Sequence, residues 1–250
     1  SHSISLSGLN PATTYYYVVN STDIASNSAE SGDYSFTTSS DIEAPTWSGV
    51  ISSPSSPSTY SETTSQFNTT WNDNVEMSSV IIEHNFTGTL ANYTPGQSGS
   101  EFTYSYDLKA GSYVWRYYAN DSSGNLNSTS QYVHTVNKAT PTITLELNEV
   151  NANITVDEDT SVNVTGTMSM PSGELDLRRN GTLIGQSNNV VTNIAAYEPG
   201  IYGLTVYYAG NKNYTEQTVA RTLTVNDITA PNVTLNGPGH LSEDKDSNVV

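Results

Sequence analysis

The feature that most constrains the fold is a pattern that occurs three times along the chain. In each copy, a turn containing Pro, Ala or Gly leads into an alternating run that starts with a tyrosine. The three runs start at Tyr15, Tyr113 and Tyr202. Alternation with a period of two places every second side chain on one face of a β-strand. The pattern therefore predicts one equivalent strand in each of three repeats.

A second regularity sets the size of the repeats. A further strand-like run ends each repeat, and a linker with a proline follows, at Pro45, Pro141 and Pro231. These prolines lie 96 and 90 residues apart, which is the size of one small β-sandwich domain. The predicted domains are, in chain order, 1–40, 41–137, 138–227 and 228–250. We expect the inner two to be complete and the outer two to be parts of domains, as in an excerpt from a longer array.

Each complete unit contains short alternating runs for two sheets. The later unit has seven predicted strands, at 142–147, 162–168, 174–178, 182–185, 190–194, 202–208 and 222–225. The clearest strands of the earlier unit are 67–71, 80–84, 102–106 and 113–119. Asn180-Gly181 is typical of a tight β-hairpin. Seven short strands in about 90 residues predict an all-β protein of tandem Greek-key immunoglobulin-like β-sandwich domains.

Composition supports this fold class and limits the partners. The chain has 17 Tyr against 4 Phe, and only 35% of its residues are hydrophobic. The formal net charge of −17 opposes contact with nucleic acid phosphates and anionic lipid, so nucleic acid is not an expected partner. The absence of cysteine excludes disulfides and thiolate metal sites. No apolar run approaches the roughly 20 residues that span a bilayer, so we expect no direct membrane insertion of this segment.

The tyrosine at the start of each run has a predicted structural role. Tyr15, Tyr113 and Tyr202 follow their turns at the spacing of the tyrosine corner of Greek-key sandwiches. In that motif the phenol bonds to a backbone group upstream and fixes the crossover between the sheets. A role in binding is the alternative, and we favour the structural one.

Three stretches carry a resemblance to domains of surface proteins. The stretch 9–38, from Leu-Asn-Pro-Ala-Thr-Thr-Tyr to Phe-Thr-Thr, resembles the second half of a fibronectin type III domain. The stretch 207–225 is similar to immunoglobulin-like repeats of bacterial surface proteins. The Ala-Pro-Asn-Val-Thr-Leu-Asn-Gly-Pro sequence from Ala230 resembles such repeats in archaeal surface proteins. The resemblance implies an extracellular, adhesin-like or sheath-like array at a cell surface, and it implies no chemistry.

The residues that support catalysis are not arranged for it in the sequence. His2, His84, His134 and His240 lack any paired metal-binding spacing, and we expect them at solvated positions. No Gly-x-Ser-x-Gly motif is present. The adjacent acids at 157–159 project to different sides of a turn and cannot face each other across a substrate as the acids of a glycosidase do. We therefore predict that the chain is not an enzyme.

Calcium is the cofactor that the sequence suggests. Asp121-Ser-Ser-Gly-Asn125 places oxygen-bearing side chains around a glycine, like part of a calcium loop, but it lacks the bidentate Glu that completes one. Asp227 lies in Asn-Asp-Ile-Thr-Ala-Pro, which resembles the interdomain calcium linker of cadherins. The candidate ligands are thus Asp121, Asn125 and Asp227. The alternative is an Asx turn, in which such side chains bond to their own backbone.

Two further sets of residues point to contacts and to modification. Tyr16, Tyr118 and Tyr207 occupy the outward position of the same strand in successive repeats, where rings stack on sugars or pack against a neighbouring copy; the recurrence favours assembly. Asparagines in Asn-x-Ser/Thr sequences are candidate N-glycosylation sites. They are Asn20, Asn68, Asn85, Asn92, Asn120, Asn127, Asn153, Asn163, Asn180, Asn213 and Asn232.

Together these features favour a mechanical role. The leading interpretation is an extracellular structural repeat segment of a cell-surface protein, a stalk, sheath or filament building block that acts by spacing and self-association. Its expected partners are copies of itself or other surface proteins. The alternatives are an adhesin that binds glycan or protein through exposed aromatics and loops, and an accessory module of a secreted polysaccharide hydrolase.

Overall fold

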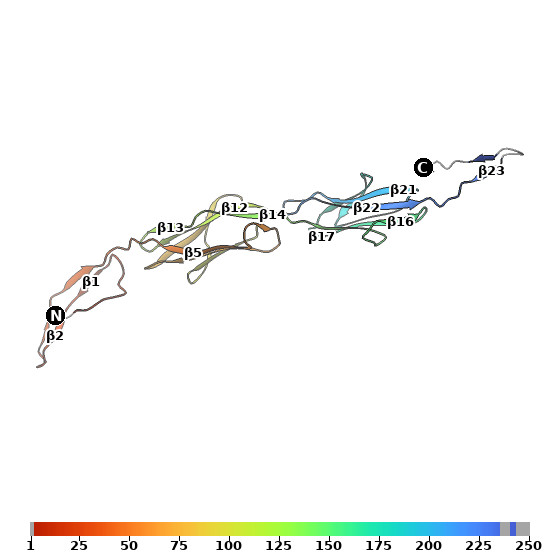
Figure 1. The fold of residues 1–250 in the computed structure, drawn as a ribbon. Coiled ribbons are helices and arrows are strands. Elements are labelled where there is room, and N and C mark those ends of the chain that lie inside the picture. Colours follow the sequence, from red (N-terminus) through yellow and green to blue (C-terminus); the bar gives the residue numbers. More distant parts are fainter. Residues whose placement is uncertain (1–2, 236–240, 244–250) are drawn as a thin grey trace. The chain divides into compact units, whose positions relative to one another are not determined.

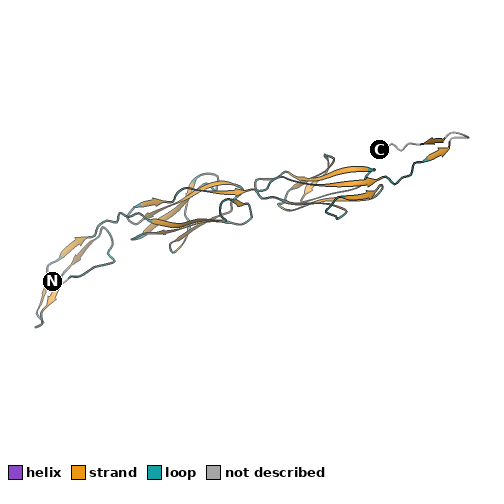
Figure 2. Ribbon diagram, viewed as in Figure 1, coloured by secondary structure: helices purple, strands orange, loops and turns teal. Residues whose placement is uncertain are grey.

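The computed structural model describes residues 3–235 and 241–243, and His2 and His240 lie outside this part. The chain divides into two units, Ser1–Asn137 and Lys138–Val250 (Figure 1). Every regular element of the described residues is a β-strand (Figure 2). Among these residues, none forms a helix with the length and apolar character needed to cross a membrane. The predicted all-β class is therefore confirmed.

The first unit begins with two small antiparallel sheets. β1 (Thr14–Tyr17) pairs with β4 (Tyr34–Thr37), and β2 (Asn20–Thr22) pairs with β3 (Ser28–Glu30). The rings of Tyr15 and Phe36 stack across the β1–β4 pair with their centroids 5.8 Å apart. The first alternating run of the sequence therefore includes a strand, as predicted.

A two-sheet sandwich forms the rest of the first unit. One sheet has the strand order β10-β11-β7-β5, and the other has the order β6-β14-β12-β8-β9 with β13 beside β12. β6 and β14 pair in parallel, whereas the other pairs are antiparallel. The strands are β5 (Thr46–Ser53), β6 (Ser58–Thr59), β7 (Ser65–Asn72), β8 (Met77–His84), β9 (Ala91–Tyr93), β10 (Gly96–Ser98), β11 (Glu101–Tyr106), β12 (Gly111–Asp121), β13 (Leu126–Ser128) and β14 (Tyr132–Asn137).

Alternation along β12 builds the core of this sandwich. Trp115, Tyr117 and Ala119 are buried, and the residues between them face outward and are half-buried. The hydroxyl of Tyr117 donates a 2.6 Å hydrogen bond to the carbonyl of Phe67 on the opposite sheet. This bond and the edge-to-face contact between Phe67 and Trp115 join the two sheets through the core.

The two described histidines correct an expectation from the sequence. His84 and His134 are fully buried in this sandwich and not solvated. The imidazole of His84 lies between the rings of Phe86 and Tyr93, with centroid distances of 4.0 and 4.2 Å. Both histidines point inward because of their strand parity, and an aromatic-rich core accommodates a flat neutral ring.

The second unit holds a similar sandwich. One sheet has the strand order β15-β17-β20, and the other has the order β16-β22-β21-β18-β19. β16 pairs in parallel with β22, so the first two strands of the domain belong to opposite sheets, as do β5 and β6 of the first sandwich. The strands are β15 (Thr142–Leu147), β16 (Ile154–Asp157), β17 (Ser161–Met170), β18 (Glu174–Arg179), β19 (Thr182–Asn188), β20 (Val190–Ala196), β21 (Gly200–Tyr208) and β22 (Gln217–Asn226).

The core of the second sandwich is aliphatic. Leu145, Leu175, Leu204 and Leu223 have no exposed surface, and they come from both sheets. Asn180 and Gly181 have φ values of 47° and 83° and connect β18 to β19, as expected for the tight hairpin that the sequence predicts. Beyond the sandwich, β23 (Val233–Leu235) pairs with β24 (Leu241–Glu243).

Candidate metal centre of the first sandwich

Three aspartates from separate parts of the first unit meet at one end of its sandwich. Asp41 belongs to the linker before β5, Asp73 to the turn between β7 and β8, and Asp121 to the end of β12. One carboxylate oxygen of each lies within 4.8 Å of the other two. The strand order explains this proximity, because β7 ends and β8 and β5 begin at the end of the sandwich where β12 finishes.

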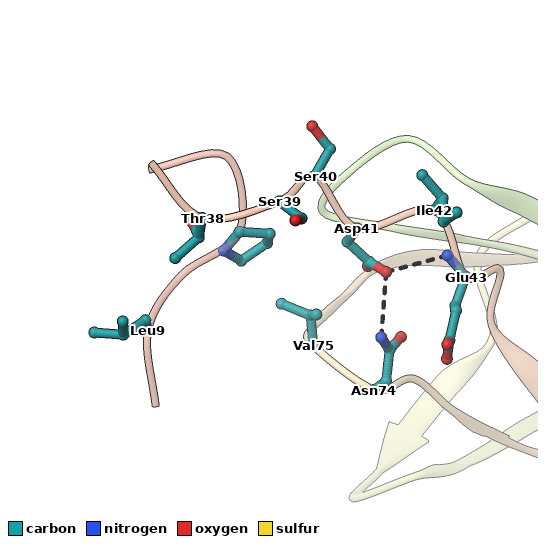
Figure 3. Close-up of a pocket in the computed structure, with 10 residues that line it drawn as sticks. Leu9, Thr38, Ser39, Ser40, Asp41, Ile42, Glu43, Asn74 and Val75 are labelled. Atoms are coloured by element: carbon teal, nitrogen blue, oxygen red, sulfur yellow. Dashed lines mark hydrogen bonds between the residues drawn. The ribbon is translucent and has the colours of Figure 1, made fainter. Parts of the chain in front are cut away.

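Each of these aspartates is fixed by hydrogen bonds to nearby groups. Oδ2 of Asp73 accepts the backbone N–H groups of Val75 and Glu76 at 2.9 and 3.1 Å. Oδ1 of Asp41 accepts the N–H of Glu43 at 3.1 Å and the side-chain amide of Asn74 at 3.2 Å (Figure 3). Both are turns of the Asx type, in which a short carboxylate satisfies the backbone of its own loop.

Asp121 is held in the same way, although it lies deeper. Its Oδ1 accepts the backbone N–H groups of Ser123 and Asn125, and its Oδ2 accepts the amide of Asn125 at 2.7 Å. Only 1% of the surface of Asp121 is exposed. Burial acts to raise the pKa of this carboxyl, but the hydrogen bonds from Asn125, Ser123 and Gly124 outweigh it and hold the pKa below its usual range.

Two oxygens of the cluster have no partner among the described residues. Oδ2 of Asp41 and Oδ1 of Asp73 are buried, and no donor in this part of the chain reaches either of them. The ion pairs of the described residues, Arg116–Glu83 and Arg178–Asp176, do not involve this cluster. Buried carboxylate oxygens without a donor or a neighbouring cation are unfavourable, so the arrangement fits a bound cation.

The donor set selects the class of cation. All three side chains offer oxygen, and no sulfur or imidazole belongs to the cluster. Oxygen-only sites suit calcium or magnesium, whereas zinc and copper prefer nitrogen and sulfur ligands. Calcium tolerates irregular ligand geometry better than magnesium. The residues therefore fit calcium.

The acids that meet in the structure differ from the set of ligands that the sequence suggests. Asp121 lies in the cluster, and the amide of Asn125 donates to it and to the carbonyl of Asp41 at 3.2 Å. The loop from Asp121 to Asn125 is thus an Asx loop, the alternative considered from the sequence. Asp23 and Asn27 form the same loop, with two backbone N–H groups on Oδ1 of Asp23.

Asp41 and Asp73 were not predicted as ligands from the sequence. The signal that was available is their position, since each lies in a connection between two strands, and Asp73 directly follows β7. Their convergence depends on strand order, which periodicity does not give. Asp227 belongs to the second unit, where its Oδ1 accepts the N–H of Thr229 at 3.0 Å.

Side chains of each sandwich also hold a linker. In the first unit the amide of Asn127 donates to the carbonyl of Pro45 at 2.7 Å, beside the bond from Asn125 to Asp41. In the second unit Glu158 accepts the N–H of Ile228 at 2.9 Å and the hydroxyl of Thr229. The hydrogen bond from Thr229, followed by that from Ile228, lowers the pKa of Glu158.

The three tyrosines at the starts of the alternating runs all bond to backbone upstream. The hydroxyl of Tyr113 donates to the carbonyl of Lys109, and that of Tyr202 donates to the carbonyl of Glu198, both at 2.9 Å. The hydroxyl of Tyr15 accepts the N–H of Asn10 at 2.8 Å. These contacts have the geometry of a tyrosine corner.

The three outward tyrosines differ in their surroundings. Tyr16 is 78% exposed. Tyr118 is half-buried, with the guanidinium of Arg116 lying 4.7 Å from its ring centroid. Tyr207 is also half-buried, and its hydroxyl donates to Glu216 at 3.3 Å. The rings therefore do not share one environment.

The asparagines of the Asn-x-Ser/Thr sequences fall into two groups by exposure. The exposed ones are Asn20, Asn92, Asn153, Asn180 and Asn232. The half-buried ones are Asn68, Asn85, Asn120, Asn127, Asn163 and Asn213. Glycosylation of any of them stays a prediction.

Comparison with known proteins gives structural similarity alone. No protein-family model and no curated protein matches the sequence. The fibronectin(III)-like modules of CbhA from Clostridium thermocellum match 69% of this chain and 92% of their own, at 15% identity and a TM-score of 0.30. A tandem-domain segment of titin matches 76% and 70%, at 11% identity and a TM-score of 0.38.

A third similar structure is a Ca²⁺-stabilized adhesin with which an Antarctic bacterium binds ice. It matches 88% of this chain at 17% identity and a TM-score of 0.33, and the match spans 59% of the adhesin chain. The chain thus resembles tandem immunoglobulin-like and fibronectin III-like repeats. Because these TM-scores are below 0.5, the immunoglobulin-like assignment rests on the strand order of the two sandwiches.

Proposed function

We propose that the chain is an extracellular structural repeat segment of a cell-surface protein that acts by spacing and self-association. The observation that carries this proposal is that side chains of each sandwich hold the backbone of a linker. Asn125 and Asn127 hold the linker before β5, and Glu158 holds the linker after β22. A linker fastened to its domain bends less than a free one, which is what a spacing element needs.

The role that we propose is non-catalytic and uses calcium. The acidic side chains around the linkers act as hydrogen-bond acceptors for loop backbone, which is a structural task. The cluster of Asp41, Asp73 and Asp121 is the candidate calcium site. A bound ion would add to the hydrogen bonds that restrain the first linker, since Asp41 belongs to that linker.

Support for self-association comes from an edge strand of the second sandwich. β20 pairs with β17 on one side only, so its other side carries backbone groups outside the β15-β17-β20 ladder. Val190 and Ile194 lie on its outward face, and 49% and 67% of their surfaces are exposed. Exposed apolar side chains beside a strand edge are typical of protein–protein contacts.

Electron microscopy of the protein isolated from its native cell surface, with and without a chelator, tests this proposal. Ordered filaments or lattices would support assembly through these domains. Dispersed molecules in both samples would contradict self-association. Digestion of intact cells with an added protease tests the location, because a surface protein is cleaved while the cells stay whole.

An adhesin that binds glycan is the second candidate function. A pocket beside Tyr207 is lined by Glu174, Asp176, Gln186 and Asn211. The amide of Gln186 donates to both carboxylates at 3.0 and 2.9 Å, which fixes polar groups next to an aromatic ring. Such a combination suits a sugar. Glycan-array binding that Tyr207→Ala abolishes would favour this candidate over the structural one.

A further inference from the structure

We propose that Asp41, Asp73 and Asp121 bind one calcium ion that fastens the linker before β5 to the first sandwich. The three carboxylates come from three segments that are distant in the sequence, the linker, the β7–β8 turn and the end of β12. Binding of the ion is the use of calcium proposed above, whereas its effect on the linker rests on the proposed spacing function, and the two are tested separately.

The two unpartnered oxygens are the independent observation that points to a ligand. Oδ2 of Asp41 and Oδ1 of Asp73 are buried, yet neither accepts a hydrogen bond from residues 3–235 or 241–243. The other oxygen of each carboxylate is fully engaged, by Glu43 and Asn74 at Asp41 and by backbone N–H groups at Asp73. Each side chain therefore uses one oxygen to fix its loop and leaves the other for an ion.

The hydrogen bonds orient the carboxylates before any ion arrives. The turn at Asp73 and the Asx loop at Asp121 set their side chains through backbone N–H groups, so ordering these ligands costs little conformational entropy on binding. The site gathers three acids, and their hydrogen-bond partners in the described part of the chain include no Lys or Arg. A divalent cation offsets the repulsion among these carboxylates.

The position of Asp41 in the linker determines how a bound ion would affect the linker. Asp73 and Asp121 belong to the sandwich, whereas Asp41 belongs to the linker and is attached to the sandwich by hydrogen bonds from the amides of Asn74 and Asn125. An ion that all three carboxylates share ties the linker to two loops of the sandwich at once. Without the ion, repulsion between the carboxylates favours release of Asp41.

Isothermal titration of the whole chain with CaCl₂, after treatment with a chelator, tests the site. We expect Asp73→Asn to weaken the binding at this site at least tenfold. Asparagine keeps the acceptor oxygen for Val75 and Glu76 and replaces only the free oxygen, so the turn is retained. Asp23→Asn is the matched control, because Asp23 forms the same Asx loop as Asp121 and belongs to no cluster of acids among the described residues.

Two results would overturn the assignment. One is an absence of calcium binding up to millimolar concentration, the weak end of the range for extracellular modules. The other is equal binding by the native chain and Asp73→Asn. Far-ultraviolet circular dichroism of both variants shows whether they fold. Asp41→Asn changes the carboxylate that the linker contributes, and it provides a second test that leaves the residues of the sandwich unchanged.

The linker effect is measured separately. The native chain lacks cysteine, so Ser40→Cys and Ser105→Cys give two defined positions for spin labels, one in the linker and one on an outward face of the sandwich. We expect a narrow distance distribution with calcium and a broader one with chelator. Calcium binding without narrowing would retain the site and contradict the restraining role. Narrow distributions with no calcium binding would contradict the site and leave the proposed spacing function intact.

Discussion

At the scale of single residues, tyrosine hydroxyls fix the entries to strands in both units. Tyr113 and Tyr202 lie in different sandwiches and donate to the carbonyl four residues upstream at the same distance, 2.9 Å. Each bond closes the turn that precedes a central strand, β12 or β21. Because one bond recurs in two domains, we expect the hydroxyl, and not only the ring, to stabilise the repeat.

Removing that hydroxyl has a defined cost. We expect Tyr113→Phe and Tyr202→Phe each to lower the free energy of unfolding of its sandwich by about 1 kcal/mol, because the upstream carbonyl loses its donor. Thermal and urea unfolding measure the change. Tyr16→Phe is the control, because Tyr16 is 78% exposed, and it should leave the unfolding curve unchanged. Unchanged curves for Tyr113→Phe and Tyr202→Phe would contradict the corner assignment.

A second position at this scale is a glycine inside the second sandwich. A Cβ atom on Gly166 would lie 2.7 Å from Cγ2 of Val206 and 3.1 Å from Cγ1 of Val191. We expect Gly166→Ala to destabilise the domain by about 1–3 kcal/mol through overpacking. Gly203→Ala on β21, where the nearest atom is 3.5 Å away, is the control. Equal melting temperatures for the two variants would contradict this close packing.

At the scale of elements, the strands that can be predicted from the sequence are those with one face buried in the core and the other exposed. The predicted strand at 142–147 is β15 without any shift, and 202–208 lies within β21. β16 (Ile154–Asp157) was missed, as was β6, because each is short and is defined by parallel pairing with a distant strand, β22 or β14. The alternation of apolar and polar residues along a strand does not show which distant strand it pairs with.

The buried histidines and the acidic cluster were missed for related reasons. His84 and His134 occupy inward positions of β8 and β14. A histidine in an alternating run can belong to either the polar or the buried face, so its burial cannot be predicted from the run alone. The cluster depends on loops that only the assembled sandwich brings together. Asp121 was identified because its ligand-like spacing is local, whereas Asp41 lies 32 residues before Asp73 and its role is not local.

The buried histidine gives the first sandwich a specific sensitivity to acid. Burial lowers the pKa of His84 to about 4, and its Nδ1 accepts the N–H of Phe86, which fixes the neutral ring. The pKa of the unfolded residue is about 6.5. Because the unfolded chain binds the proton more readily, stability is lost as the pH falls from about 6.5 towards 4.

Calorimetry between pH 7 and pH 4.5 measures this effect. We expect the melting temperature of the first sandwich to fall by roughly 5 °C or more from the histidine contribution. His84→Phe should remove part of that fall, since it replaces the titrating ring with one that packs between the same neighbours. The second sandwich, whose residues 138–227 contain no histidine, is an internal control. The same pH dependence in His84→Phe and the native chain would contradict this account.

At the scale of the whole molecule, the acidic residues have two roles. The chain has 25 acidic and 8 basic residues. Some of the acids fasten loops and linkers, as Asp23, Asp73 and Glu158 do through backbone N–H groups. The remaining excess gives every copy the same sign of charge, which keeps single molecules apart in solution. Assembly of copies must therefore overcome a repulsion that depends on the solvent ions.

This repulsion gives the self-association proposal a quantitative test. The Debye length falls from about 30 Å at 0.01 M to about 8 Å at 0.15 M ionic strength. We expect sedimentation velocity to show single molecules at the lower ionic strength and larger species at the higher one, because screening allows apolar contacts such as those of Ile194 to form. Ile194→Lys, which places a charge on the exposed edge strand, should reduce the larger species at the same salt concentration. Association that weakens as salt rises would show that ion pairs hold the copies together, and it would contradict the apolar contact that we propose.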